Sequence, residues 1–349
     1  MTLQSTGQIT FSNITSEFGT PSNSNLGAFR VSESHGSLSN IPLDSNLDGT
    51  NPIPQTGEIK FSDFYGRRLN VVVDCHSGST ETRGNAKSKY NGNQVSVVGG
   101  FRSHPSPPTG IKVIINVNKS FKSEAGKAKN VVALRTGEYG SDCLLRVDVG
   151  SEGYIGGAGG NGGKGGNSGS NSGSGGEDGN SGLGIDHESS DGTTVINNSG
   201  TISAGFGGGG GGGGAFQSDS TGGKNSKTSN RHASGGGGGG GAGFPAGSGG
   251  KGALKGSDGS NGSDGTKSAA GGGGSGGNND GEAKGGKGGD GGSGGEAPDA
   301  GQNATSGDKK GSGGSAGEDG AAIRIKSGIT ISVVNNGSIK GSQSATGVA

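Results

Sequence analysis

Short alternations of apolar and polar residues dominate the first 66 residues, and one of them occurs twice. Residues 6–14, TGQITFSNI, match residues 56–64, TGEIKFSDF. In each copy Ile and Phe alternate with polar residues, which is the period-two pattern of a short half-buried strand. Because the segment 1–66 is too short and polar to hold a stable core of its own, we predict that it is a docking segment that lies against another protein.

The segment 67–150 contains several short runs of β-branched residues. The runs lie at 69–75, 94–98, 111–117, 130–134 and 143–149. They are separated by the Gly, Pro, Asn and Ser clusters that are typical of turns, and none has the apolar period of a helix. We therefore predict a small β-domain over residues 67–150, built as a sandwich or as a single β-layer.

Residues 151–322 have almost no hydrophobic pattern, because glycine takes its place. Glycine runs occupy 207–214 and 235–241, and a Gly-Gly-x triplet dominates elsewhere, as in 285–296. From Lys255 to Gly320 there is no Val, Ile, Leu, Met, Phe or Tyr, so this stretch cannot bury an apolar core. The composition suits a flexible linker, whereas collagen needs abundant proline and an unbroken glycine period.

The triplet period supports a third interpretation, in which glycine forms extended threefold rods. Such rods resemble polyproline II and have no internal hydrogen bonds, so their backbone groups need partners in neighbouring rods. Only glycine lets rods approach this closely, since a Cβ would hold the backbones apart. The third residue of each triplet in 285–296 is polar, as an outward position requires: Lys287, Asp290, Ser293 and Glu296.

One pattern occurs three times where strand-like runs meet glycine. A β-like run is followed by Gly-x-Ile at 153–155, 200–202 and 337–339. The irregular spacing argues against a solenoid of fixed period, so we expect strands that feed and seal layers of rods. The predicted fold is mainly β and irregular with almost no α-helix: the β-domain, a glycine-rich polyglycine II helix sandwich over 151–322, and a C-terminal strand cap over 323–349.

Residues 197–202, NNSGTI, lead into the glycine run 207–214. This arrangement resembles the receptor-recognising adhesin at the tip of T-even-type bacteriophage long tail fibres, and the resemblance covers roughly residues 130–349. The repeat in residues 1–66 is similar to repeats in structural proteins of other tailed phages. In the adhesin family, glycine runs pack as polyglycine II rods, and the loops between them contact an outer-membrane receptor. The loops of this chain are mostly Ser, Asn, Lys and Asp, whereas the family's loops are rich in aromatic residues.

The resemblance implies a virion protein of the tail fibre or tail tip that mediates attachment to the host surface. Its implied partners are other phage tail proteins and a host cell-surface receptor, either a protein or a glycan. A homotrimer and a monomer on a trimeric fibre are both compatible with it. The alternative is a purely structural virion or surface protein without direct receptor contact.

The longest loop between glycine runs, residues 215–234, is the best candidate for receptor contact, because loops on a rigid scaffold carry binding functions. Aromatic residues and Arg are favoured interface anchors. The candidate receptor-binding residues are Phe216, Lys224, Lys227, Arg231 and His232 of this loop, and Phe244 of a later turn. In the alternative, the phenylalanines Phe206, Phe216 and Phe244 only cap the ends of rods.

Charge and side-chain chemistry argue against several other functions. Lys+Arg and Asp+Glu are balanced at 29 each, which is unlike the basic surface of a nucleic-acid-binding protein. We find no secretory signal and no transmembrane segment, so we expect synthesis in the host cytoplasm and no membrane insertion. No histidine lies in a convincing catalytic pattern, and aspartates such as Asp264 and Asp290 lack the apolar neighbours of calcium-binding repeats.

We therefore predict no enzymatic activity, no metal site and no cofactor. Two cysteines occur, Cys75 and Cys143. They are expected to be buried thiols, with a single disulfide as the alternative.

Overall fold

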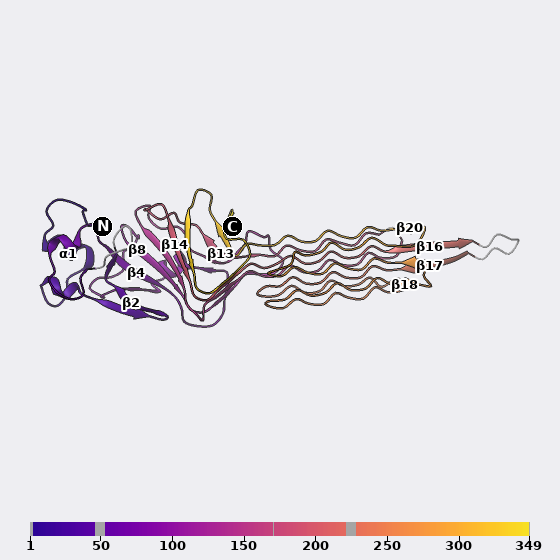
Figure 1. The fold of residues 1–349 in the computed structure, drawn as a ribbon, viewed down its shortest axis with the longest axis horizontal. Helices are drawn as coiled ribbons and strands as arrows, with labels where there is room; N and C mark the ends of the chain where they lie inside the picture. Colours follow the sequence, from indigo (N-terminus) through magenta and orange to yellow (C-terminus); the bar gives the residue numbers. More distant parts are fainter. Residues whose placement is uncertain (1–2, 46–52, 170, 221–227, 349) are drawn as a thin grey trace.

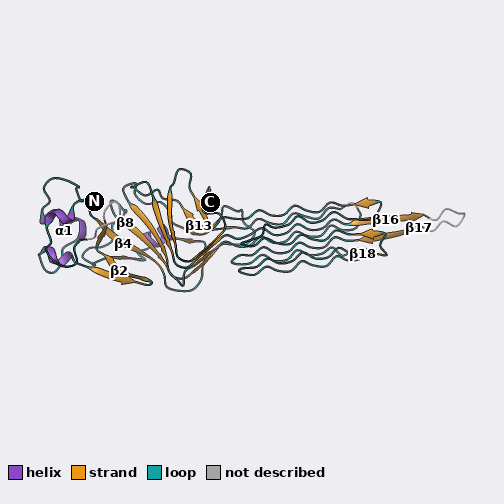
Figure 2. Cartoon of the chain, in the orientation of Figure 1, coloured by secondary structure: helices purple, strands orange, loops and turns teal. Residues whose placement is uncertain are grey.

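The computed structural model describes residues 3–45, 53–169, 171–220 and 228–348. Two bodies follow one another along the long axis: a β-rich body that contains both chain ends, and a bundle of glycine-rich rods (Figure 1). The chain is mainly β, as predicted, and the described residues include two α-helices, both short (Figure 2). None of the helices in the described part of the chain is long and apolar enough to cross a membrane.

Three parallel sheets make up the β-rich body, and successive coils of the chain each add one strand to every sheet. The first sheet stacks β4 (Arg68–Cys75), β8 (Lys112–Val117), β11 (Leu144–Val149), β14 (Thr194–Asn198) and β22 (Ile331–Asn335). The second stacks β5 (Glu81–Thr82), β9 (Ser120–Lys122), β12 (Tyr154–Gly156), β15 (Thr201–Ser203) and β23 (Ser338–Lys340). The third stacks β6 (Gly84–Asn85), β10 (Val132–Arg135), β13 (Ser181–Ile185), β21 (Ile323–Ile325) and β24 (Ala345–Thr346). We call this body the solenoid.

The three Gly-x-Ile junctions are the same corner of successive coils. Ile155 pairs with Ile202, and Ile202 pairs with Ile339, in parallel register. The irregular spacing argued against a solenoid of fixed period, and the structure is instead a solenoid whose coils differ in length, which the sequence analysis did not predict. Glycine-rich excursions are inserted between β12 and β13 and between β15 and β21, always between a second-sheet and a third-sheet strand. Insertions at one corner hide the period of the sequence but leave the stack of strands intact.

The strands predicted over residues 67–150 are all present. They correspond to β4, β8, β10, β11 and β7 (Val95–Val97), of which β7 pairs antiparallel with β4. The interior of the solenoid is filled by fully buried side chains such as Val73, Ile115, Leu134 and Ile155. The helix α2 (Ala86–Asn91) was not predicted, and it begins where Asn85 Oδ1 accepts the Ser88 N–H at 3.0 Å.

Residues 3–45 and 53–66 cover the first coil, and we call these two segments together the cap. Its elements are α1 (Phe11–Phe18), η1 (Leu26–Phe29), β1 (Ser32–His35), β2 (Leu38–Pro42), β3 (Asp44–Ser45) and η2 (Phe61–Phe64). Ile14, Phe18, Phe29 and Phe64 are fully buried in the same apolar cluster as the interior of the solenoid. The cap therefore closes the first end of the sheet stack with its own apolar side chains.

The prediction that both copies of the repeat form strands is wrong, because each copy begins a helix. In the first copy Asn13 Oδ1 accepts the Thr10 N–H at 2.9 Å, and in the second Asp63 Oδ2 accepts the Lys60 N–H at 2.7 Å. A polar residue three positions into a helix that reaches back to the capping N–H is half of a capping box. The repeat thus encodes a helix start, and the alternation of Ile and Phe is incidental to it.

The backbone hydrogen bonds of the rods have a threefold period. In the rod 205–214, the N–H groups of Gly208, Gly209 and Gly210 bond to three different neighbouring rods, at Glu177 O (2.9 Å), Gly239 O (2.8 Å) and Asp299 O (3.0 Å). The next three residues return to the same rods, at Ser174 O, Gly236 O and Gln302 O. This is the pattern expected of extended glycine rods with three residues per turn.

The uninterrupted glycine runs lie in the middle of the bundle, where a side chain has no room. A Cβ on Gly209 would lie 2.1 Å from Gly289 O, and a Cβ on Gly238 would lie 2.0 Å from Gly209 O. At the edge, Lys287 is exposed, and a Cβ on Gly272 would meet no atom closer than 3.8 Å. Position within the bundle therefore explains which rods tolerate a third residue other than glycine.

Polar side chains also complete the hydrogen bonds at the edge of the bundle. Asn261 Oδ1 accepts the Gly252 N–H at 2.9 Å, and Asp264 Oδ1 accepts the Gly249 N–H at 2.7 Å. Asp290 Oδ1 likewise accepts the Gly273 N–H at 2.7 Å. Some outward residues thus turn back and bond an N–H group on the next rod.

Candidate receptor-binding tip

The end of the rods farthest from the cap carries a small group of strands (Figure 1). These are β16 (Ala215–Ser220), β17 (Thr228–Ala233), β18 (Asn278–Asn279), β19 (Ala283–Lys284) and β20 (Lys309–Lys310). β16 pairs antiparallel with β17 and β20, and β18 pairs antiparallel with β19. Ser257, in the turn after Leu254, joins β17 through a bridge to Ala233. We call this group the tip.

Small side chains mark the point where the rods change into the tip. Ala215, Ala233, Ala283 and Ala304 form a buried cluster there. The strand β16 continues directly from the central rod 205–214, so the first residues of the tip are still packed at rod spacing. The larger side chains begin at Phe216, one residue beyond the alanine layer.

Arg231 on β17 lies among three carboxylates from different strands and turns. Its guanidinium is 3.0 Å from Glu282 Oε2, 3.4 Å from Asp219 Oδ2 and 3.5 Å from Asp280 Oδ2. A hydrogen bond with Asp219 is the largest cause that raises the pKa of Glu282. The Arg231 side chain is 28% exposed, so this cation joins β16, β17 and the β18–β19 hairpin while keeping part of its surface open to solvent.

Phe216 and His232 face each other across β16 and β17. Their ring centroids are 5.0 Å apart, and Lys309 Nζ on β20 lies 5.9 Å from the Phe216 ring. Asn279 Nδ2 donates to the backbone oxygen of His232 at 3.3 Å. Phe216, His232 and Lys309 therefore form one contact group of the tip, and the Asn279 amide bonds the main chain of the same strand.

Leu254 is a tip residue that the sequence analysis did not identify. It lies in the turn that packs against His232 through the Ser257 N–H to His232 O bond of 2.9 Å. Its side chain is 78% exposed, the highest value among the exposed large hydrophobic residues of the described chain. One feature of the sequence points to Leu254: it is the last large aliphatic residue before the stretch 255–320, which has none.

The structure brings together three of the predicted residues and separates a fourth. Phe216, Arg231 and His232 lie in the tip, whereas Phe244 lies at the opposite end of the rods. There its ring packs on Tyr154 of the solenoid at 5.4 Å between centroids, with Lys267 Nζ 3.4 Å from the Tyr154 ring. Lys224 and Lys227 lie outside the described residues.

The other residues considered for chemistry, the possible metal ligands and the two cysteines, do not form a reactive site among the described residues. The described residues contain no group of three or more His, Cys, Asp or Glu side chains arranged to hold a metal ion. Cys75 and Cys143 are buried and unpaired, and burial raises the pKa of Cys75 to about 12. By the strand register, Cys143 aligns with Leu69, which lies about 20 Å along β4 from Cys75. That distance is too long for a disulfide.

Comparison with known families gives one match. The model of the family described as phage tail fibre adhesin Gp38 matches residues 79–344. The matched range begins in the first coil, ends in the last, and includes all the rods and the tip. No curated protein and no solved structure matches the chain.

Proposed function

The chain belongs to the phage tail fibre adhesin Gp38 family, and we propose that it contacts the host receptor through the tip of its glycine rods. As a member of this family it is a tail-fibre adhesin of the virion that mediates host attachment. Its partners are a host receptor and components of the phage tail. The proposal concerns which surface and which residues make the receptor contact.

The single observation that carries the proposal is the position of the anchor residues. Phe216 on β16, Arg231 on β17 and Leu254 in the turn bonded to β17 all belong to the tip, at the end of the rods farthest from the cap (Figure 1). Aromatic residues and Arg dominate the binding energy of protein interfaces, and the exposed Leu254 of the same tip adds apolar area. A rigid bundle of rods holds these side chains far from the rest of the molecule, as an attachment protein requires.

Phage adsorption tests this proposal. We expect Arg231→Ala and Leu254→Ser each to lower the adsorption rate by about tenfold, the size of one strong interface contact. Lys251→Ala is the matched control, because Lys251 is an exposed residue on the side of the same rod that ends at Leu254. Wild-type adsorption by both tip variants, with normal incorporation into virions, would assign receptor contact to another surface.

At the other end of the molecule, we propose that the cap docks onto the phage tail. Phe61 in η2 supports this assignment, because its side chain is 42% exposed while Phe64 of the same turn is fully buried. Phe61→Ser should release the protein from purified virions without changing its fold, and quantification of the protein in virions measures this. Unchanged incorporation would remove Phe61 from the docking surface.

We further propose that the protein acts without catalysis, metal or cofactor, and that it does not bind nucleic acid or insert into membranes. The balanced charge of 29 basic and 29 acidic residues supports the lack of nucleic-acid binding. Synthesis in the host cytoplasm, followed by assembly as a homotrimer or as a monomer on a trimeric fibre, completes the proposal. Light scattering of the purified protein distinguishes the two assemblies.

A further inference from the structure

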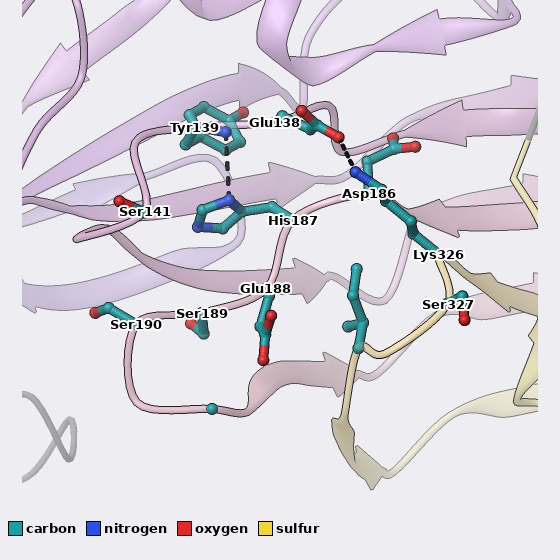
Figure 3. A pocket seen from close by; sticks show the side chains of 12 residues that line it. Glu138, Tyr139, Ser141, Asp186, His187, Glu188, Ser189, Ser190, Lys326 and Ser327 are labelled. Atoms are coloured by element: carbon teal, nitrogen blue, oxygen red, sulfur yellow. Dashed lines mark hydrogen bonds and ion pairs between the residues drawn. The ribbon is translucent and has the colours of Figure 1, made fainter.

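A cleft of about 590 Å³ lies among loops of the solenoid, and Figure 3 shows the side chains that line it. Its walls are three stacked loops, which connect a third-sheet strand to the next first-sheet strand in successive coils. Residues 138–141 form the first loop, 186–192 the second and 326–329 the third. The volume lies in the range that holds a small ligand.

Several polar groups in the cleft already have structural partners. Asp186 Oδ1 accepts from Arg135 at 2.6 Å, and His187 Nδ1 accepts the Tyr139 N–H at 3.3 Å. Lys326 forms an ion pair with Glu138 (Figure 3). These contacts fix the three loops relative to one another and leave the cleft with a preformed shape.

Three other side chains in the cleft remain available. Among the described residues, the side chains of Ser141, Glu188 and Ser327 have no hydrogen bond or ion pair, and all three line the cleft. Glu188 is exposed. One carboxylate can accept two hydrogen bonds, and each hydroxyl can both donate and accept. Ile329 adds a small apolar area beside them.

This set of groups matches one ligand chemistry better than the others. An anion is disfavoured, because the cleft holds three carboxylates and its one lysine is already paired. A peptide is disfavoured, because loops line the cleft and offer no strand edge or helix groove, and the two aromatic rings there, Tyr139 and His187, pack edge to face on each other at 5.6 Å between centroids. Two neighbouring hydroxyls of a sugar ring present two donors to one carboxylate, while the C–H face of the ring suits Ile329.

From this geometry we propose that the cleft is a saccharide-binding site, with Glu188 accepting hydrogen bonds from a pair of ligand hydroxyls. Ser141 and Ser327 bond the remaining hydroxyls, and Ile329 packs against the ring. The ligand class is a neutral or amino-substituted oligosaccharide of a bacterial surface. The site lies on the solenoid, so it is independent of receptor contact by the tip.

Saturation-transfer NMR on the purified full-length protein tests the site, with soluble oligosaccharides from bacterial lipopolysaccharides as probes and trilysine as a peptide control. We expect at least one neutral or amino oligosaccharide to bind. Glu188→Gln should weaken that binding about tenfold, and Ile329→Trp should abolish it by filling the cleft. Glu152→Gln is the matched control, because Glu152 is an exposed glutamate at another corner of the same coil.

Three results would overturn the proposal. One is an absence of binding by every oligosaccharide up to about 10 mM, a concentration tenfold above a Kd of about 1 mM. Another is equal binding by the wild type and Glu188→Gln, and the third is binding of trilysine alone. Arg231→Ala should leave saccharide binding unchanged, so that failure of the cleft and failure of the tip are separate outcomes.

Discussion

The solenoid and the rods use backbone hydrogen bonds in different directions, and this decides what their side chains can be. A strand in the solenoid forms backbone hydrogen bonds with a neighbouring strand on each of two sides. Its side chains occupy the two remaining faces, and those on the inner face, such as Ile155 and Ile202, fill the interior. A glycine rod bonds to neighbours all around its axis, as Gly208, Gly209 and Gly210 do. No face is then left for a Cβ. One region is stabilised by buried carbon, the other by closely packed main chain.

The comparison also explains why the rods start and end on the solenoid. Ordering glycine costs more backbone entropy than ordering any other residue, so a rod gains by having its ends held in place. The excursions leave the solenoid after β12 and after β15, and they return at β13 and β21. The spacing of paired strands in the sheets therefore sets the spacing of the rods that leave and re-enter the solenoid. The remaining rods pack against these.

The largest expected effect is the disruption of the rods by Gly209→Val. Its Cβ would lie 2.1 Å from Gly289 O, and both rods are bonded to other neighbours, so neither can move aside. We expect a loss of more than about 3 kcal/mol, the upper range for overpacking. Hydrogen exchange should show unprotected amides over residues 205–320, with the solenoid strands still protected.

Gly272→Val is the control for this experiment. The nearest atom to its Cβ would be Ser263 Oγ at 3.8 Å, so the same substitution has room at the edge of the bundle. Equal protection of the rods in the Gly209→Val and Gly272→Val proteins would contradict the close-packed arrangement.

The solenoid should respond to the opposite change, the removal of carbon. Ile155→Ala removes a fully buried side chain, and we expect a loss of about 2–5 kcal/mol. All tyrosines and both cysteines lie outside the rods, so tyrosine fluorescence reports the solenoid together with the cap, and thiol labelling of Cys75 and Cys143 reports the solenoid. Val334→Ala, at a side chain that is 50% exposed, should change stability by less than about 0.5 kcal/mol. Equal losses for the two variants would argue against a packed interior.

The sequence predicts local elements well where one signal determines them. Runs such as 69–75 and 111–117 are β-branched and bounded by turn residues, and they form β4 and β8. The helix starts at Thr10 and Lys60 were not predicted. The capping signal rests on two residues in each copy, whereas the alternation of apolar and polar residues, which favours a strand, spans the whole repeat. Asn13 and Asp63 carry the capping signal in the sequence, while the alternation of Ile and Phe around them predicts a strand.

Stacking of coils could not be predicted, because it depends on the length of each insertion. The loops of the cleft lie near residues 138, 188 and 326, and only the parallel register brings them together. Phe216 and Arg231 of the tip were identified from their loop, since chain neighbours across a hairpin stay close. Leu254 was missed because its turn joins β17 through Ser257, a contact that the sequence does not encode locally.

A fall in pH should have a smaller effect on stability than these substitutions. The effect should be stabilising in the cap and destabilising at the edge of the rods. Burial raises the pKa of Asp44 in the cap to about 6, although Arg67 opposes the shift. A raised carboxyl pKa stabilises the fold at low pH, so the contribution is full below about pH 4 and lost as the pH rises through 6. We expect Asp44→Asn to remove about 2 kcal/mol of this pH dependence, measured by tyrosine fluorescence during unfolding at pH 4.5 and pH 7.

At the edge of the rods the sign is reversed. The Gly273 N–H lowers the pKa of Asp290, so its contribution is present above the ordinary pKa and lost as the pH falls. After correction for the intrinsic pH dependence of amide exchange, the exchange rate of the Gly273 amide should therefore rise as the pH falls. Over the same pH range the cap should become more stable. If the cap and this edge of the rods both gained or both lost stability as the pH falls, the opposite pKa shifts of Asp44 and Asp290 would be contradicted.

The smallest predicted effect concerns whether the edge of the bundle needs its polar side chains. Asn261 is exposed, and its Oδ1 accepts the Gly252 N–H at 2.9 Å. Asn261→Leu should cost about 1 kcal/mol, the net value of one hydrogen bond, and should raise exchange at Gly252. Asn261→Asp keeps the acceptor and should preserve protection. If Asn261→Leu leaves exchange at Gly252 unchanged, water satisfies the edge, and the main chain of the rods is sufficient to hold the bundle together.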